Sequence, residues 1–124
     1  MFIYYDSKTG NVQRFIDKLK KERPKWSFIK INETMEVENS GHLITFTTKF
    51  GEIPETTVEF LKKENNRNFI KSVSSSGNMN WGTLFGVAAD KISREYNISI
   101  LMKFELSGTQ PQVEYFINYV ENDN

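Results

Sequence analysis

Cysteine is absent from the 124-residue sequence. This absence excludes disulfides, thiolate metal sites, iron–sulfur clusters and thiol redox chemistry. The single histidine, His42, lies at the start of an apolar run, where a structural or surface role is more common than catalysis. The carboxylates form no obvious acid–base pair or metal-binding cluster. We therefore predict no catalytic residue and no metal site, so any redox activity must depend on a bound cofactor.

An excess of charge is also missing, because 16 Lys and Arg residues balance 16 Asp and Glu residues. A neutral chain has no overall field to hold a polyanion such as nucleic acid. The one basic cluster falls at the end of a predicted helix, where cations complement the helix dipole. It comprises Lys18, Lys20, Lys21, Arg23 and Lys25. We expect no nucleic-acid partner.

Long hydrophobic runs are absent too. No segment approaches the about 18 apolar residues of a membrane span, and the apolar run in residues 1–6 has no preceding basic region of the kind found in signal peptides. We therefore expect no membrane association and a cytoplasmic location. The length lies within the roughly 100 to 200 residues of one domain, so we predict a single domain over residues 1–124.

What is present is an alternation of short apolar runs with amphipathic segments, which is typical of an α/β protein with a parallel sheet between crossover helices. We predict strands at about Met1–Tyr5, Trp26–Ile31, His42–Thr47, Phe69–Val73 and Ile98–Phe104. Four helices are predicted, one from roughly Pro54 to Glu64 and three from apolar stripes of helical spacing. The stripes are Val12, Phe15, Ile16 and Leu19; Phe85, Ala88, Ala89, Ile92 and Tyr96; and Val113, Phe116, Ile117 and Val120.

In an open parallel sheet a ligand binds outside the carboxyl ends of the strands, and three loops of unusual composition are predicted there. The first, residues 6–11, joins a strand to a helix. Its backbone amides and the hydroxyls of Ser7 and Thr9 suit a phosphate, while Gly10 permits close approach. A well-capped helix without a ligand explains the same residues equally well. The loop lacks the glycines of a nucleotide P-loop or a dinucleotide fingerprint.

The other two loops each carry an aromatic residue. Residues 47–54 place Phe50 beside Gly51, where it is a candidate stacking surface for a planar ring, although such a side chain more often folds back onto the core. Residues 74–82 form a polar segment with Trp81 near its end, longer than the usual connection of about 2 to 6 residues. Together the three loops predict a ligand with a phosphate at one end and a flat ring at the other, as in flavin mononucleotide (FMN).

These loops resemble those of the NrdI family, the flavodoxin-like accessory proteins of class Ib ribonucleotide reductase. The matching segments are YDSKTGNV at residues 5–12, TTKFGEIP at 47–54, SGNMNWG at 76–82 followed by Phe85-Gly86, and FELSGT at 104–109. The resemblance implies a flavodoxin-like three-layer sandwich, with a five-stranded parallel sheet of order 2-1-3-4-5 and helices on both faces, and non-covalently bound FMN.

The resemblance also implies a role and partners. Reduced flavin reacts with oxygen, and the resulting superoxide or peroxide passes to the dimanganese site of the reductase's small subunit, where a tyrosyl radical is generated for deoxyribonucleotide synthesis. The expected partners are that small subunit, which is expected to dock on the third loop, and an electron-donating reductase.

By position, the resemblance assigns the cofactor to three groups of residues. The phosphate is expected on Ser7, Lys8, Thr9, Gly10, Asn11 and Val12, the flavin ring beside Thr47, Thr48, Lys49, Phe50 and Gly51, and Gly77, Asn78 and Trp81 are expected to close the other side. Lys49 departs from the glycine that family members often have there. If reduction requires a left-handed conformation at this position, a non-glycine residue costs about 1 to 2 kcal/mol, and we expect the one-electron-reduced flavin to be less stable. The positive charge of Lys49 near the reduced anionic flavin would instead raise the second reduction potential, so the two effects compete.

Two other interpretations of the sequence stay open. A general flavodoxin that carries electrons to several enzymes is usually strongly acidic, because charge steers transient docking, whereas this chain is neutral. A flavin-free interaction module on the same fold is the other, against which the intact first loop argues.

Overall fold

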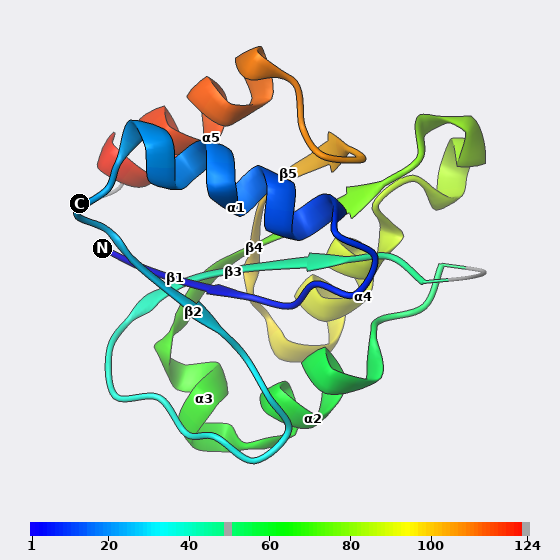
Figure 1. Ribbon diagram of the computed structural model, residues 1–124. Coiled ribbons are helices and arrows are strands. Elements are labelled where there is room, and N and C mark those ends of the chain that lie inside the picture. Colours follow the sequence, from blue (N-terminus) through cyan, green and yellow to red (C-terminus); the bar gives the residue numbers. More distant parts are fainter. Residues whose placement is uncertain (49–50, 123–124) are drawn as a thin grey trace.

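The computed structural model describes residues 1–48 and 51–122, in which a parallel β-sheet lies between two layers of helices (Figure 1). The strands are β1 (Phe2–Tyr5), β2 (Ser27–Lys30), β3 (Gly41–Phe46), β4 (Ile70–Gly77) and β5 (Ser99–Glu105). The helices are α1 (Asn11–Glu22), α2 (Glu55–Lys62), α3 (Glu64–Phe69), α4 (Val87–Tyr96), α5 (Gln110–Asn122) and the short 3₁₀-helix η1 (Met79–Leu84). The order β2-β1-β3-β4-β5, with every pair parallel, confirms the predicted α/β fold and strand order.

Helices α1 and α5 cover one face of the sheet, and α2, α3 and α4 cover the other (Figure 1). The predicted apolar stripe of α1 is buried to 1% exposure or less, and the stripe of α5 to 4% or less. At the centre of this face Phe15 stacks on Phe104 with ring centroids 4.0 Å apart. Because burial of apolar surface is the main force holding helix to sheet, the periodicity alone fixes which side of each helix faces inward.

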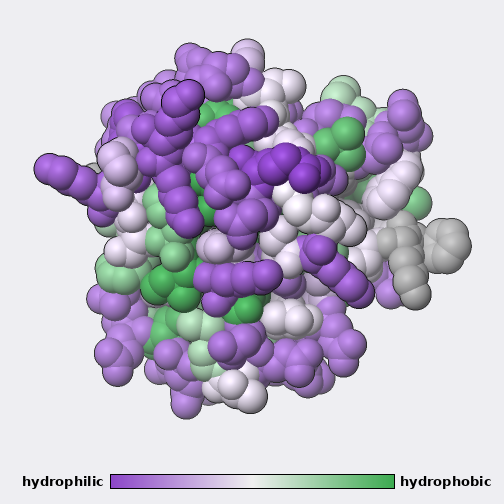
Figure 2. Space-filling model, in the orientation of Figure 1, coloured by the Kyte–Doolittle hydropathy of each residue, from purple (hydrophilic) through white to green (hydrophobic). Residues whose placement is uncertain are grey.

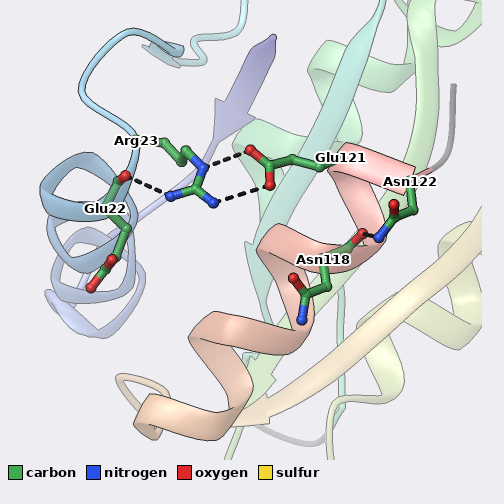
Figure 3. A network of polar contacts seen from close by, with 5 residues as sticks. All are labelled: Glu22, Arg23, Asn118, Glu121 and Asn122. Carbon is green, nitrogen blue, oxygen red and sulfur yellow. Dashed lines mark hydrogen bonds and ion pairs between the residues drawn. The ribbon is translucent and has the colours of Figure 1, made fainter.

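An ion pair joins Arg23, the residue that directly follows α1, to Glu121 of α5 (Figure 3). Arg23 Nε and Nη2 lie 2.6 and 3.0 Å from the two carboxylate oxygens of Glu121. The two side chains are 37% and 39% exposed, so solvent screens the attraction. The predicted basic helix end is confirmed here, since Lys20 and Lys21 lie in the last turn of α1.

The structure corrects the predicted end of the fourth strand. β4 runs from Ile70 to Gly77, so the serines expected to begin a loop instead lie inside the sheet. The buried Ser74 hydroxyl has no hydrogen-bond partner among the described residues. The other two are satisfied: Ser75 Oγ lies 3.0 Å from Thr47 Oγ1, and Ser76 Oγ donates to the carbonyl of Leu106 at 2.5 Å. A run of polar residues can occupy a strand when neighbouring segments satisfy its hydroxyls.

The helix predicted from roughly Pro54 to Glu64 corresponds to α2, whose bounds, Glu55–Lys62, lie within two residues of the prediction. A second helix, α3, was not predicted; it follows Lys63, whose backbone is extended. Pro54 precedes α2 with φ −57° and ψ 143° rather than forming part of its first turn. The second helix is anchored by buried Asn66, whose Oδ1 accepts from the amide of Val37 at 2.9 Å, a long-range contact that periodicity does not reveal.

His42 is completely buried in β3, where its Nδ1 lies 2.6 Å from Ser72 Oγ. This position is within the sheet core, which agrees with the predicted structural role. Among the described residues, none of the helices has both the length and the apolar character needed to cross a bilayer.

Candidate functional site

A cavity of about 400 Å³ lies at the carboxyl ends of β1, β3 and β4. Four segments that are distant in the sequence meet there. Its lining residues are Lys8, Thr9, Asn11, Val12, Phe46, Thr47, Thr48, Ser76, Gly77, Asn78, Trp81 and Leu106. The three loops predicted from the sequence therefore share one cavity, and a fourth segment joins them.

The first loop is compatible with both interpretations that the sequence left open. Ser7 Oγ accepts a hydrogen bond from the amide of Gln13 at 3.0 Å, so this hydroxyl satisfies the first turn of α1. Gly10, with φ 98°, precedes the helix in a left-handed conformation that favours glycine. Lys8, Thr9, Asn11 and Val12 line the cavity. The first amides of a helix have no partner within the helix, so the start of α1 can receive an anion there.

Ser7 itself lies on a different hollow. This second hollow, of about 600 Å³, opens beside the cavity and shares Lys8, Phe46 and Thr48 with it. Of the six predicted phosphate ligands, Ser7 and Gly10 therefore do not line the cavity. The Ser7 hydroxyl is bonded to the amide of Gln13 instead.

The second loop is fixed to α4 and to itself. Thr47 is buried and its Oγ1 accepts from the amide of Ala88 at 3.4 Å. Thr48 and Glu52 exchange two backbone hydrogen bonds of 2.9 Å. Gly51 is buried with φ 86°, packed against the start of α4 rather than lining the cavity. Predicted positions 49 and 50 of this loop, Lys49 and Phe50, lie outside the described residues, so their roles stay predictions.

The third loop presents apolar side chains to solvent. It begins at Gly77, where an added Cβ would lie 2.7 Å from the backbone nitrogen of Gly86, so only glycine permits this approach of two backbones. Trp81 is 39% and Met79 is 64% exposed. At the upper right of Figure 2, on the side where Figure 1 draws the residues near 80, a small area of hydrophobic surface lies among hydrophilic atoms. Exposed apolar residues grouped at one place often mark a binding surface.

Leu106 also lines the cavity. It belongs to the family-like segment at residues 104–109 but was not among the predicted site residues. Its φ is 48°, a conformation unusual for a residue with a side chain. The amide of Leu106 donates to the carbonyl of Gly77 at 2.9 Å, and its carbonyl accepts from Ser76 Oγ. The two bonds hold the side chain beside the cavity, where it is 41% exposed. Its place directly after the last strand was the signal that could have identified it.

Phe46 and Ser76 were also missed as lining residues. Both belong to strand ends, Phe46 to the last position of β3 and Ser76 to the last but one of β4. Residues at the carboxyl ends of parallel strands share the sheet edge with the loops that follow them. The last residues of a predicted strand are therefore candidates for the cavity wall, as the loop residues are.

A buried carboxylate, Asp6, lies directly after β1. It is 7% exposed, and Thr57 Oγ1 donates to its Oδ2 at 2.7 Å. The Thr45 and Thr57 hydroxyls lie 2.8 Å apart, so the three side chains form a buried chain of hydrogen bonds. Burial raises the pKa of Asp6, and the hydrogen bond from Thr57 and the nearby cations Lys30 and Lys8 offset part of this effect.

The arrangement suits binding more than acid–base or metal chemistry. One part of the cavity offers helix amides, a lysine and an amide side chain, and the other offers Phe46, Trp81 and Leu106. Within residues 1–48 and 51–122, no group of three or more His, Asp or Glu side chains could hold a metal ion.

The parallel sheet of order 2-1-3-4-5, with a cavity of ligand size at the carboxyl ends of its strands, defines a flavodoxin-like protein. A solved structure, a short-chain flavodoxin associated with a bacterial microcompartment, matches the fold with a TM-score of 0.65. The match covers 97% of this chain and 93% of that chain, at 18% sequence identity. The similarity supports the fold.

The sequence relatives identify the family. The family described as "NrdI Flavodoxin like" matches residues 3–118. Protein NrdI of Bacillus licheniformis is 47% identical over 119 residues, which cover 96% of this chain and 86% of that protein. The SPbeta prophage-derived protein NrdI of Bacillus subtilis is 41% identical over 117 residues, covering 94% and 88%. The chain belongs to the NrdI flavodoxin-like family, as the resemblance indicated.

Proposed function

We propose that residues 1–124 form a single FMN-binding domain that serves class Ib ribonucleotide reductase as an oxidant-delivering accessory protein. The observation that carries the proposal is that loops predicted to bind the phosphate and the ring of FMN border one cavity in a chain of the NrdI family.

The cavity fits FMN in size and chemistry. Its volume of about 400 Å³ falls in the range of roughly 300 to 1,000 Å³ found for small-molecule sites. The phosphate would be held at the start of α1 by Lys8, Thr9 and Asn11. The flat ring would lie against the apolar surfaces of Trp81 and Leu106. An aromatic face and apolar walls suit a planar ring system.

The family name supports the connection with ribonucleotide reductase, and the chemistry follows from the cofactor. When bound and reduced, FMN supplies electrons that convert oxygen to superoxide or peroxide. The protein's contribution is to hold the flavin, and to present the exposed apolar segment around Met79 and Trp81 as the docking surface for the dimanganese small subunit. A reductase that supplies electrons completes the partners, and we keep the cytoplasmic location as part of the proposal.

The first experiment asks whether flavin binds and what it does. The protein is loaded with FMN, freed of excess, reduced without oxygen and exposed to air in the presence of a superoxide reporter. We expect a bound-flavin absorption spectrum and a rapid reporter signal. A protein that stays colourless after FMN is added would contradict the proposal and favour the flavin-free interaction module.

The second experiment tests delivery. The reduced protein is mixed with the manganese-loaded small subunit, oxygen is admitted, and the tyrosyl radical is counted by electron paramagnetic resonance. Free reduced FMN at the same concentration is the matched control, and we expect far less radical from it. Equal radical yields would show that the protein does not deliver the oxidant. If electron transfer to unrelated acceptors is also rapid, the chain is a general flavodoxin.

A further inference from the structure

Asn11, at the start of α1 and on the cavity wall, has an unusually constrained side chain. Its Oδ1 accepts from Nη2 of Arg14 at 2.6 Å and from Oγ of Ser107 at 3.0 Å. Arg14 Nε also donates to Ser107 Oγ at 2.9 Å. The three side chains therefore form a closed triangle that joins the first loop to the segment between β5 and α5.

The triangle decides which way the Asn11 amide faces. A side-chain amide has one acceptor end and one donor end. Both bonds that Asn11 makes in the triangle use its oxygen, and rotating the amide by half a turn would place its NH₂ group against the guanidinium of Arg14. The NH₂ group is therefore the end left to donate, and Asn11 lies where the start of α1 meets the cavity.

We propose that Arg14 and Ser107 are positioning residues that hold the Asn11 amide with its Nδ2 toward an anion in the cavity, and so set the preference for a phosphorylated over an unphosphorylated flavin. This inference rests on the proposed function, because it takes the ligand to be FMN. It adds two residues outside the cavity lining and a reason for phosphate specificity.

Lys18 supports the triangle from the same helix. Its Nζ donates to the carbonyls of Ser107 and Gly108 at 3.1 and 2.6 Å. These bonds fix the backbone that carries the Ser107 hydroxyl. The guanidinium of Arg14 lies beside the first loop, since an added Cβ on Gly10 would lie 2.9 Å from Nη1.

Two substitutions distinguish an orienting role of Arg14 and Ser107, which acts through the Asn11 amide, from direct attraction between the Arg14 charge and a phosphate. Arg14 is exposed, so its charge is screened by solvent, and Ser107 has no charge at all. If Arg14 acts by charge, Arg14→Lys preserves its effect and Ser107→Ala changes nothing. If both residues act by orienting Asn11, both substitutions weaken the binding of phosphate, because lysine lacks the planar fork of donors.

The test compares dissociation constants for FMN and riboflavin, measured by quenching of flavin fluorescence. The variants are Arg14→Lys, Arg14→Gln and Ser107→Ala, with Lys21→Gln as the matched control, since it removes an exposed positive charge from the same helix. We expect each of the first three to weaken FMN about tenfold, the loss of roughly one good hydrogen bond, while riboflavin binding and the control stay unchanged. In an Asn11→Ala background the Arg14 and Ser107 substitutions should have no further effect.

Two results would overturn the inference: wild-type FMN affinity in both Arg14→Lys and Ser107→Ala, or equal losses for FMN and riboflavin, which indicate a general structural role. A second measurement uses inorganic phosphate and the flavin-free protein, following the Asn11 side-chain NH₂ signals by NMR. We expect phosphate to shift these signals in the wild type and not in Ser107→Ala; signals that stay in place in the wild type would contradict the proposal. If the wild type takes up no FMN, the proposed function fails, and the phosphate titration still decides the role of Asn11.

Discussion

The cavity has two different walls. At the start of α1 the wall contains polar side chains that are hydrogen-bonded to distant parts of the chain, whereas around η1 large apolar side chains are exposed to solvent. Asn11 is bound by Arg14 and by Ser107, which lies 96 residues further on. The side chains of Trp81 and Met79, by contrast, are 39% and 64% exposed. The hydrogen bonds at these two residues are made by their backbone amides, from Trp81 to the carbonyl of Asn78 and from Met79 to Glu105 Oε2.

The difference follows from the directionality of the two kinds of interaction. A hydrogen bond to a phosphate works only at a narrow range of distances and angles, so the donors must be fixed before the ligand arrives. Apolar contact is non-directional and scales with the area removed from water, so Trp81 and Leu106 can be left exposed. We infer that the polar end provides specificity and that the apolar end provides contact area for a ring and for a protein partner.

The largest expected effect is at the apolar end. Trp81→Ala should weaken FMN and riboflavin alike by roughly tenfold, since an aromatic contact contributes about 0.5 to 1.5 kcal/mol beyond the area it buries. The midpoint of urea unfolding should change little, because the side chain is already exposed. Tyr115→Ala, at a 54% exposed aromatic residue of α5 outside the cavity lining, is the control. Loss of FMN binding with unchanged riboflavin binding would contradict the division between the two ends.

A smaller effect is expected from Asp6→Asn, at a buried carboxylate that follows β1 and lies outside the cavity lining. Burial raises the pKa of Asp6, so the folded state holds this proton more tightly than the unfolded state. The group then contributes stability when protonated, and this contribution is lost as the pH rises through the folded-state pKa. Asparagine removes the buried charge and keeps an oxygen to accept from Thr57. We expect a gain at neutral pH on the order of 1 kcal/mol in the free energy of unfolding.

The pH dependence of this gain is the decisive measurement. Urea unfolding of Asp6→Asn and the wild type should give converging stabilities toward and below pH about 3.9, the ordinary aspartate pKa. Glu114→Gln, at an exposed carboxylate of α5, serves as the control. A variant that is less stable than the wild type at neutral pH would show that Thr57, Lys30 and Lys8 make the ionised carboxylate favourable.

The smallest effect should come from a pair outside both ends of the cavity. Arg23→Gln breaks the exposed ion pair with Glu121 (Figure 3). We expect it to change stability less than Asp6→Asn does, as measured by the thermal midpoint, and to leave FMN affinity unaltered. The hydrogen bond from Arg23 lowers the pKa of Glu121, so the pair's contribution is present above the ordinary glutamate pKa and is lost as the pH falls through the lowered value. Lys21→Gln, which removes a positive charge from the last turn of α1, is the control. An effect that persists in high salt would contradict a screened surface pair.

Much of the fold could be predicted because its signals are local. The stripe from Val12 to Leu19 and that from Val113 to Val120 each give one face of a helix, and these faces are the ones buried. The predictions failed where polar residues are buried by partners distant in the sequence: Ser75 and Ser76 continue β4 because Thr47 and Leu106 satisfy their hydroxyls.

The site was predictable to the same extent. Loop composition and family resemblance pointed to residues such as Thr9, Asn11 and Trp81, which line one cavity. The resemblance to the family was confirmed, whereas the cofactor itself and the roles of the site residues stay predictions. Neither composition nor resemblance distinguished Ser7, whose hydroxyl accepts from the first turn of α1, from Asn11, which lines the cavity. Both belong to the same short polar segment.

By itself, the sequence determined the class of fold, the faces of the helices, the family and the loops that carry the site, because periodicity and motifs are properties of neighbouring residues. The tertiary structure alone decided which distant residues are hydrogen-bonded. The amide of Leu106 donates to Gly77, Thr57 donates to Asp6, and Arg14 and Ser107 donate to Asn11. These contacts join segments brought together when the parallel sheet aligns the carboxyl ends of its strands, and no local pattern encodes that alignment.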